Sequence, residues 1–154
     1  GPDYVIIQRF SQWKQQDYTA RLALTPDELP KFLEPLTDAG VDIFHASTRR
    51  FWEPEFPGSD LNLAGWTKKI TGLPAITVGS VGLKGVDFVH SLRNPDTSEV
   101  SDLGELEARL ARNEFDLVAV GRALISDANW VAKVRDGRTT ELQPFSPEAL
   151  KAFV

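Results

Sequence analysis

Four short apolar segments recur along the chain and predict β-strands at residues 5–10, 41–46, 75–79 and 115–120. The last two are nearly continuous apolar runs, which is typical of parallel strands buried on both faces. Segments with helical character follow the strands and predict helices at residues 25–38, 61–71, 103–112 and 122–137. A short terminal helix is expected after Ser146, because the sequence Ser-Pro-Glu there combines a good N-cap with proline at the first helical position.

Local signals refine the bounds of the first two helices. Residues 25–28 read Thr-Pro-Asp-Glu, a capping-box pattern with proline at the first helical position. Gly40 closes this helix, but Pro35 lies inside it and predicts a kink or a shortened helix. Gly72 stops the second helix.

The strands and helices alternate as four β-α units, which predicts a parallel sheet with right-handed crossovers. A closed barrel of eight such units needs about 250 residues, so the 154 residues correspond to half of one. We therefore expect an α/β fold in which residues 1–154 form one half-barrel domain. Two connections are longer than usual, an aromatic and charged one at residues 47–60 and a polar one at residues 84–101.

Composition narrows the classes of function. The net charge of −5 disfavours nucleic acids and anionic membranes as partners, because both need a basic face. Cysteine is absent, which excludes disulfides, a thiolate nucleophile and a cysteine-ligated metal, and agrees with a reducing, cytoplasmic location. No apolar run approaches the roughly 20 residues of a membrane span. Glu53 and Glu55 lack companions of the metal-ligand type, so no metal site is expected.

A candidate anion site follows the fourth predicted strand, which ends in Gly121 and Arg122 before a helix signal begins. Glycine allows a ligand to approach the backbone, a helix N-terminus offers N–H groups, and arginine adds charge. The third predicted strand ends in Gly79 and Ser80. Two such turns on consecutive strands predict one phosphate group held between them, and the alternative is that the glycines only form turns.

Four segments of the predicted strands and their ends stand out together. They are IIQRFSQWK at residues 6–14, GVDIFH at 40–45, TVGSVG at 77–82 and VGRALI at 120–125. Together they resemble the last four strands of the old yellow enzyme family, in the family's order and over essentially the whole chain. This family comprises FMN-dependent NAD(P)H:flavin oxidoreductases, including ene-reductases of the 12-oxophytodienoate reductase type. The resemblance implies the C-terminal half of a TIM (β/α)8 barrel.

The resemblance also implies FMN as cofactor, NAD(P)H as reductant and activated alkenes such as α,β-unsaturated carbonyls as substrates. By position, Arg9 would lie against the flavin and stabilise negative charge on the reduced ring. The residues matching the family's FMN phosphate site are Gly79, Ser80, Gly121 and Arg122. The family's substrate-holding His-His or His-Asn pair and its tyrosine proton donor lie in the first half of the barrel. No catalytic residue is therefore expected in this chain.

Some of these residues have a structural alternative. Arg9 would instead form a salt bridge at the end of its strand. His45 lies in an apolar strand and is expected to be a core histidine. Phe51 and Trp52 begin an aromatic cluster, expected to be either a lid over flavin or substrate or a cap on the core.

A half barrel leaves two strand edges and an apolar face uncovered. We therefore expect a partner, either a chain with the N-terminal half barrel or a second copy of this chain. The first functional hypothesis is an enzyme half that is active only with the other half. The alternative is a non-catalytic half-barrel module that binds FMN or another phosphate ligand. A third hypothesis, a phosphosugar-binding half barrel, gives no use to Arg9, which a flavin needs.

Overall fold

The computed structural model describes residues 4–14, 16–85 and 98–153. The chain forms two compact units. The first unit comprises Gly1–Gly79 and Leu106–Ala119, and the second comprises Ser80–Glu105 and Val120–Val154.

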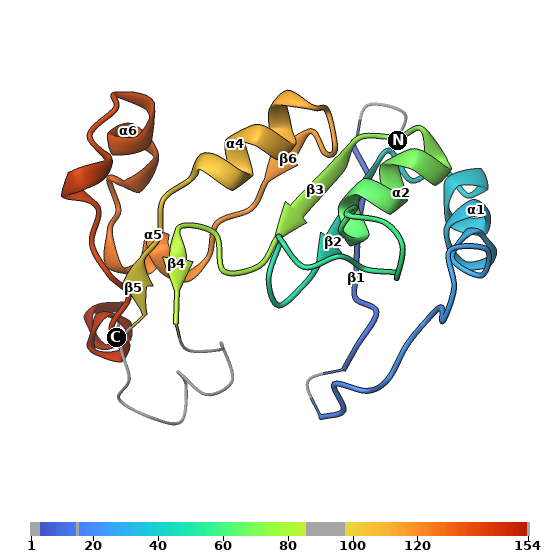
Figure 1. Ribbon diagram of the computed structural model, residues 1–154, viewed down its shortest axis with the longest axis horizontal. Helices are drawn as coiled ribbons and strands as arrows, with labels where there is room; N and C mark the ends of the chain where they lie inside the picture. Colours follow the sequence, from blue (N-terminus) through green and yellow to red (C-terminus); the bar gives the residue numbers. More distant parts are fainter. Residues whose placement is uncertain (1–3, 15, 86–97, 154) are drawn as a thin grey trace. The chain divides into compact units, whose positions relative to one another are not determined.

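A four-stranded parallel sheet forms the centre of the first unit (Figure 1). Its strands lie in the order β1 (Ile7–Phe10), β2 (Ile43–Ser47), β3 (Ala75–Val78) and β6 (Leu117–Val118). The predicted α/β arrangement of four parallel strands is therefore confirmed. Each strand is shorter than its apolar segment, because pairing with the neighbouring strand covers only part of each apolar run.

One face of this sheet is buried under helices. Phe44 and Ala46 of β2 pair with Ala75 and Thr77 of β3, and all four side chains are buried. Helix α2 (Leu63–Thr71) packs on β2 and β3 (Figure 1). Burial of this apolar face is the main stabilisation expected for such a sheet.

The opposite face carries a row of residues in register across all four strands: Arg9, His45, Ile76 and Leu117. Side chains alternate between the two faces of a strand, so this row points away from the buried face. Leu117 is 49% exposed, and Ile7, which shares this face, is 52% exposed. In a closed β-α barrel the corresponding face is filled by the side chains of the other strands.

The first helix begins later than the sequence predicts. Helix α1 spans Pro30–Asp38, whereas the capping-box pattern predicts a start at residue 26. The Glu28 carboxylate accepts a hydrogen bond from the Leu24 backbone N–H at 2.7 Å, which stabilises a turn before the helix. Proline suits the first helical position, so the helix starts at Pro30. Pro35 lies inside this short helix.

Helices α2 and α4 (Gly104–Ala111) lie close to their predicted positions. The Asn62 side-chain oxygen caps α2 by accepting a hydrogen bond from the Gly65 N–H at 2.9 Å. Gly72 ends α2 with φ +69°, a left-handed conformation that favours glycine. Helix α4 belongs to the first unit from Leu106 onwards.

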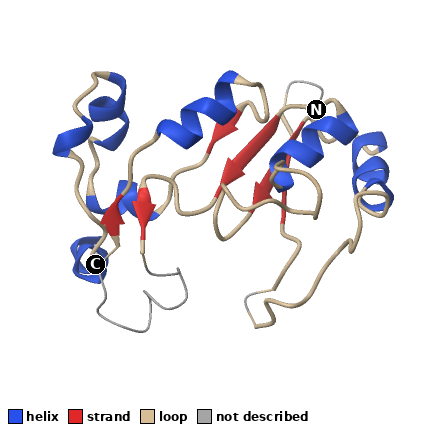
Figure 2. Ribbon diagram, in the orientation of Figure 1, coloured by secondary structure: helices blue, strands red, loops and turns tan. Residues whose placement is uncertain are grey.

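Short elements make up the second unit (Figure 2). They are the antiparallel strands β4 (Leu83–Lys84) and β5 (Glu99–Val100), helices α5 (Arg122–Ser126) and α6 (Trp130–Arg135), and the 3-10 helices η1 (Thr139–Glu141) and η2 (Pro147–Phe153). The β4–β5 pair flanks the predicted polar connection, most of which lies outside the described residues. The terminal helix is 3-10, with the predicted cap: Ser146 Oγ accepts a hydrogen bond from the Glu148 N–H at 3.2 Å.

The single helix predicted over residues 122–137 is wrong, because the chain leaves the helix at Asp127. The buried Asp127 carboxylate accepts hydrogen bonds from the Asn129 and Gln143 N–H groups and pairs with Lys133 Nζ at 2.7 Å. Its backbone is extended, and a new helix starts at Trp130. None of the helices in the described part of the chain is long and apolar enough to cross a membrane.

Candidate functional site

Arg9 lies near the carboxyl end of β1, on the partly open face of the sheet. Its Nη2 donates a hydrogen bond to Ser47 Oγ at 3.0 Å, and Ser47 is the last residue of β2. Within the described ranges, no carboxylate lies at ion-pair distance from Arg9. The carboxyl ends of the strands form the edge where β-α barrels hold their active sites, so Arg9 occupies a position suited to a ligand.

His45 is the in-register neighbour of Arg9 on β2. Its Nε2 atom is enclosed and has no hydrogen-bond partner among the residues that the structure describes. Burial first, and the charge of Arg9 second, lower the pKa of His45 below its usual value. The ring is therefore neutral at pH 7, and the positive charge on this part of the face comes from Arg9.

Gly79 closes β3 and is closely approached by the segment that follows β2. Its φ is +147°, and a Cβ atom there would lie 2.7 Å from Thr48 Oγ1, 2.8 Å from the Thr48 carbonyl oxygen and 2.9 Å from the Arg50 nitrogen. The Phe51 N–H also donates to the Gly79 carbonyl at 3.1 Å. Gly79 thus has a packing reason to be glycine, and its role at a phosphate stays a prediction.

The second unit brings Ser80 and Arg122 together. Arg122 is buried, with Nη2 3.5 Å from Ser80 Oγ and Nη1 donating to Ser98 Oγ at 3.2 Å. Its guanidinium carbon lies 5.6 Å from the centroid of the Phe145 ring. Ser80 has φ +49°, a conformation that a non-glycine residue rarely adopts outside turns and functional sites. A buried guanidinium beside hydroxyl groups is a donor set suited to an anion.

Gly121 precedes this arginine in open space, since a Cβ atom at this position would meet nothing within 4 Å beyond its chain neighbours. Helix α5 has five residues, far fewer than the predicted helix. Its N-terminus is correspondingly weak as an anion site, because the macrodipole builds up over aligned peptide groups. The chemistry of this turn therefore depends on the Arg122 side chain.

The aromatic connection between β2 and α2 is fixed at its backbone. Phe51 is buried, and its ring contacts the Trp52 ring edge-on at a centroid distance of 5.1 Å. The Phe51 carbonyl accepts a hydrogen bond from Asn62 Nδ2 at 2.7 Å, and the Trp52 carbonyl accepts one from Arg109 Nη2 at 3.1 Å. The role of Phe51 and Trp52 as a substrate lid stays a prediction.

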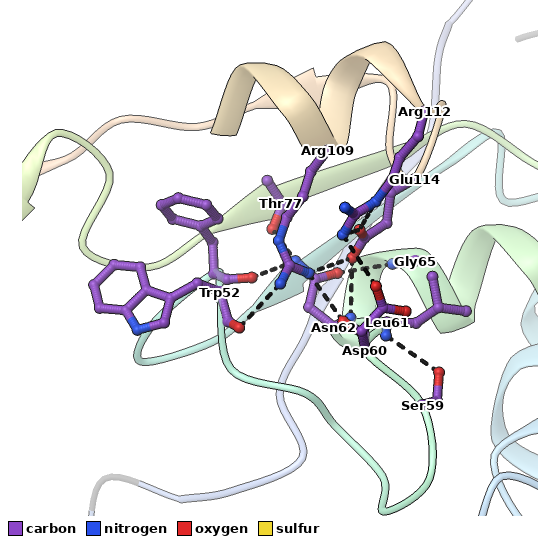
Figure 3. Close-up of polar contacts among 11 residues, drawn as sticks. Trp52, Ser59, Asp60, Leu61, Asn62, Gly65, Thr77, Arg109, Arg112 and Glu114 are labelled. Atoms are coloured by element: carbon purple, nitrogen blue, oxygen red, sulfur yellow. Dashed lines mark hydrogen bonds and ion pairs between the residues drawn. The ribbon is translucent and has the colours of Figure 1, made fainter. Parts of the chain in front are cut away.

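A buried polar network, shown in Figure 3, holds this connection. Glu114 accepts hydrogen bonds from Arg109 Nη1 at 2.9 Å and from the Asn62 N–H at 3.0 Å, and Asn62 Nδ2 also reaches Thr77 Oγ1 at 3.1 Å. Sequence reasoning missed these residues, because most of their hydrogen bonds join segments that are far apart in the chain. The only available signal is weak: Glu114 directly precedes an apolar strand segment.

Comparisons with known proteins bear on the fold and the class of this chain. No protein-family model matches it. The chain is 30% identical over 151 residues to an NADH oxidase of Thermoanaerobacter brockii, a match covering 93% of this chain and 20% of that protein. It is 27% identical over 144 residues to a bilirubin reductase of Clostridium symbiosum (strain WAL-14163), covering 86% of this chain and 34% of that protein.

The structure of morphinone reductase in complex with tetrahydroNAD matches with a TM-score of 0.60 and 17% identity, over 93% of this chain and 31% of that one. The chain resembles the old yellow enzyme type of NADH:flavin oxidoreductase. The predicted resemblance and the α/β partial-barrel fold are therefore confirmed. The chain spans only about a fifth to a third of the length of the proteins it matches.

Proposed function

We propose that this chain forms the C-terminal, FMN-binding part of a barrel NAD(P)H oxidoreductase that reduces activated alkenes, typically α,β-unsaturated carbonyls. The relatives support the coarser class of flavin-type oxidoreductase. The observation that carries the proposal is Arg122, a buried guanidinium held beside the hydroxyl groups of Ser80 and Ser98.

The residues present suit the phosphate group of FMN. Arginine binds phosphate oxygens through two parallel N–H donors, and neighbouring hydroxyl groups add hydrogen bonds. In this proposal Arg122 and Ser80 bind the phosphate, Gly121 leaves room for it, and Gly79 sets the direction of the chain leading to Ser80.

Arg9 suits the flavin ring. When bound, FMN would supply hydride transfer from NAD(P)H to the β-carbon of an activated alkene. Arg9 would hold its positive charge near the reduced ring and stabilise negative charge there. His45 stays uncharged beside it, because burial and Arg9 lower its pKa. The charge that tunes the flavin is thus that of Arg9.

The groups that hold the substrate carbonyl and donate a proton to the α-carbon are not assigned to residues of this chain. We propose that they come from an N-terminal half barrel, on another chain or in a second copy arranged to complete the barrel. The partly exposed Ile7 and Leu117 on the open face of the sheet support this, because apolar side chains there gain from being covered.

The experiment that tests this proposal is a reconstitution. The chain is mixed with FMN, alone and together with the first four β-α units of the morphinone reductase barrel, and unbound FMN is removed by gel filtration. Visible absorbance and NAD(P)H-dependent reduction of an α,β-unsaturated ketone are then recorded. Yellow colour with turnover in the pair supports an enzyme half, whereas a colourless protein in both samples contradicts flavin binding.

Two variants connect the result to the proposed residues. Arg122→Ala should weaken FMN retention by about tenfold or more, since it removes a charged phosphate contact. Arg135→Ala removes an equally charged but 74% exposed side chain of the same unit and should leave retention unchanged. Equal retention in wild type and Arg122→Ala would refute the phosphate assignment.

A non-catalytic FMN-binding module is the second candidate, favoured by the lack of expected catalytic residues. It predicts yellow colour without turnover in both samples. A phosphosugar-binding half barrel predicts neither colour nor any effect of Arg9→Gln on ligand binding.

A further inference from the structure

A small cavity of about 140 Å³ opens in the first unit, beside the carboxyl ends of β1 and β2. The segment after β1 lines it with Trp13, Tyr18 and Arg21, and the segment after β2 lines it with Arg49, Arg50 and Glu55 among others. Its volume corresponds to roughly four or five water molecules, so it accommodates a small polar group rather than a whole drug-sized ligand. None of the residues proposed to bind FMN lines it.

The Tyr18 side chain is part of the cavity lining. Its hydroxyl oxygen is enclosed and has no hydrogen-bond partner within residues 4–14, 16–85 and 98–153. The ring is held on two sides, by Trp13 edge-on at a centroid distance of 5.0 Å and by the Arg49 guanidinium 4.4 Å from its centroid. Buried hydroxyl groups nearly always have a partner, so a ligand oxygen in the cavity would complete this one.

The cavity is also rich in guanidinium groups. Arg21 Nη1 is turned to the carbonyl oxygens of Tyr18 and Ala20, at 2.7 and 2.8 Å, which fixes its position. Arg50 pairs with Glu53 at 2.8 Å, so these two charges offset one another. Glu55 is the other carboxyl group in the cavity lining, and the charge of Arg21 acts on it.

Glu55 behaves unlike an ordinary surface carboxylate. Burial raises its pKa to about 6, against the smaller lowering effects of a hydrogen bond from Gln12 and the charge of Arg21, and Glu53 raises it further. A carboxyl group with this property can hold a proton in mildly acidic solution and donate it in a hydrogen bond to an anion.

We infer that this cavity binds the carboxylate group of a small-molecule ligand, with Tyr18 and Arg49 as donors and Glu55 as a proton-sharing neighbour. A guanidinium and a phenol match the two oxygens of a carboxylate. A phosphate dianion would bring a second negative charge next to Glu55, which disfavours it. The site lies on the edge where barrel enzymes bind substrates, so the carboxylate belongs to the substrate.

The first test is a titration followed by heteronuclear NMR of the isotope-labelled chain. Acetate should shift the Trp13 indole N–H signal and the backbone amides of residues 18–21 and 48–50 in a saturable manner. Inorganic phosphate should saturate these signals only at much higher concentration. Phosphate binding tighter than acetate would overturn the assignment to carboxylates, and shifts that grow linearly with both anions would overturn the site itself.

Variants locate the binding. Arg49→Gln and Tyr18→Phe should each weaken acetate binding, the former by about tenfold. Lys14→Gln removes a charge from the same segment outside the cavity lining and should leave binding unchanged. An equal loss in Lys14→Gln would overturn the inference in favour of a general charge effect. If Arg49→Gln loses its folded spectrum, Tyr18→Phe decides, because it keeps the ring between Trp13 and Arg49.

The pH dependence tests the part of Glu55. Its charged neighbours in the cavity lining are Arg21, Arg49, Arg50 and Glu53. Because ionised Glu55 repels a carboxylate, acetate affinity should increase several-fold as the pH falls from about 7.5 to about 5.5. Glu55→Gln should abolish this dependence. A pH-independent affinity in the wild type would overturn the role of Glu55.

This inference rests on the proposed function only in assigning the carboxylate to the reducible substrate. The acetate titration needs neither FMN nor NAD(P)H, so the two can fail separately. A chain that saturates with acetate but stays colourless with FMN supports the cavity and contradicts the proposed function. A yellow, active preparation without acetate saturation overturns the cavity and leaves the proposed function intact.

Discussion

Arg109 and Glu114 form an ion pair enclosed by the first unit, with Nη1 2.9 Å from Oε1 and side chains that are only 6% and 1% exposed. Through their other hydrogen bonds, the two residues connect this part of the chain to residues 52–62, which are distant in the sequence. Arg109 also donates to the carbonyl oxygens of Trp52 and Asp60, and Glu114 accepts the Asn62 N–H. The network therefore holds both ends of the connection between β2 and α2, which carries the aromatic and cavity-lining residues.

Removing one partner of this pair should be strongly destabilising. Glu114→Gln removes a carboxylate charge beside the buried Arg109 guanidinium, so we expect the free energy of unfolding to fall by about 3 kcal/mol or more. Urea unfolding followed by circular dichroism measures this. Glu141→Gln is the matched control, since Glu141 is 51% exposed and pairs with Arg138 at the surface, where such a pair contributes at most about 1 kcal/mol. Similar losses in both variants would contradict the structural importance of the network.

Gly79 should tolerate substitution poorly. Gly79→Ala places a Cβ within 3 Å of Thr48 and the Arg50 nitrogen at a positive φ, so both steric overlap and backbone strain follow. We expect a loss of about 2 kcal/mol or more in the free energy of unfolding. Gly58 also has a positive φ, +81°, but nothing lies within 4 Å of its Cβ position. Gly58→Ala therefore measures the conformational part alone, and an equal cost at both positions would show that the close approach contributes nothing.

The positions of the strands in the first unit follow from the sequence, because nearly continuous apolar runs favour parallel strands. The expectation that residues 115–120 are buried on both faces is wrong, because β6 is only Leu117–Val118 and Leu117 is 49% exposed. The helix starting at Pro30 is harder to place, since a good cap at residues 25–28 competes with a turn that uses the Glu28 side chain. The break at Asp127 has only a weak local signal, the turn-forming residues Ser-Asp-Ala-Asn at 126–129. It depends on partners as distant as Gln143, which periodicity within a segment does not reveal.

The residues of the candidate site also divide into those that the sequence indicates and those that it does not. Arg9 and Arg122 stand out in the sequence, because Arg9 lies near the end of an apolar segment and Arg122 directly follows one after Gly121. Their neighbours do not: Ser98 follows a polar segment, and Phe145 lies in a loop near the end of the chain. The cavity around Tyr18 is equally hidden from sequence reasoning, because it forms between two long connections that carry no shared pattern.

Asp127 should make the stability of the second unit depend on pH in the acidic range. Burial alone would raise its pKa, but the hydrogen bond and charge of Lys133 and the N–H groups of Asn129 and Gln143 outweigh this and hold the pKa below its usual value. A lowered folded-state pKa means that the stabilisation is complete above the usual range of an aspartic acid and is lost as the pH falls through the folded value. Asp127→Asn should remove this part of the acid dependence.

Acid titration followed by NMR signals of Trp130, which starts the next helix, measures the effect. Glu141→Gln is a suitable control, because Glu141 is 51% exposed and pairs with Arg138 at the surface, where salt screens the interaction. An acid transition that is the same in wild type and Asp127→Asn would contradict the anchoring role of Asp127.

Glu55 predicts the opposite dependence in the first unit. Its folded pKa of about 6 lies above the reference value of 4.5, so the folded state binds the proton more tightly than the unfolded state. The contribution of Glu55 to stability is therefore greatest at low pH. The free energy of unfolding falls by about 2 kcal/mol as the pH rises through 6, because each unit of difference between the folded and reference pKa values corresponds to about 1.4 kcal/mol. Glu55→Gln should remove the loss and be more stable than wild type at pH 7.5 by about 1–2 kcal/mol, measured by urea unfolding at several pH values. Glu34→Gln removes an exposed carboxylate of helix α1 outside the cavity lining and should leave the slope unchanged. A wild-type stability that stays flat between about pH 5 and 7.5 would mean that the Glu55 carboxyl is better solvated than its surroundings in the cavity indicate.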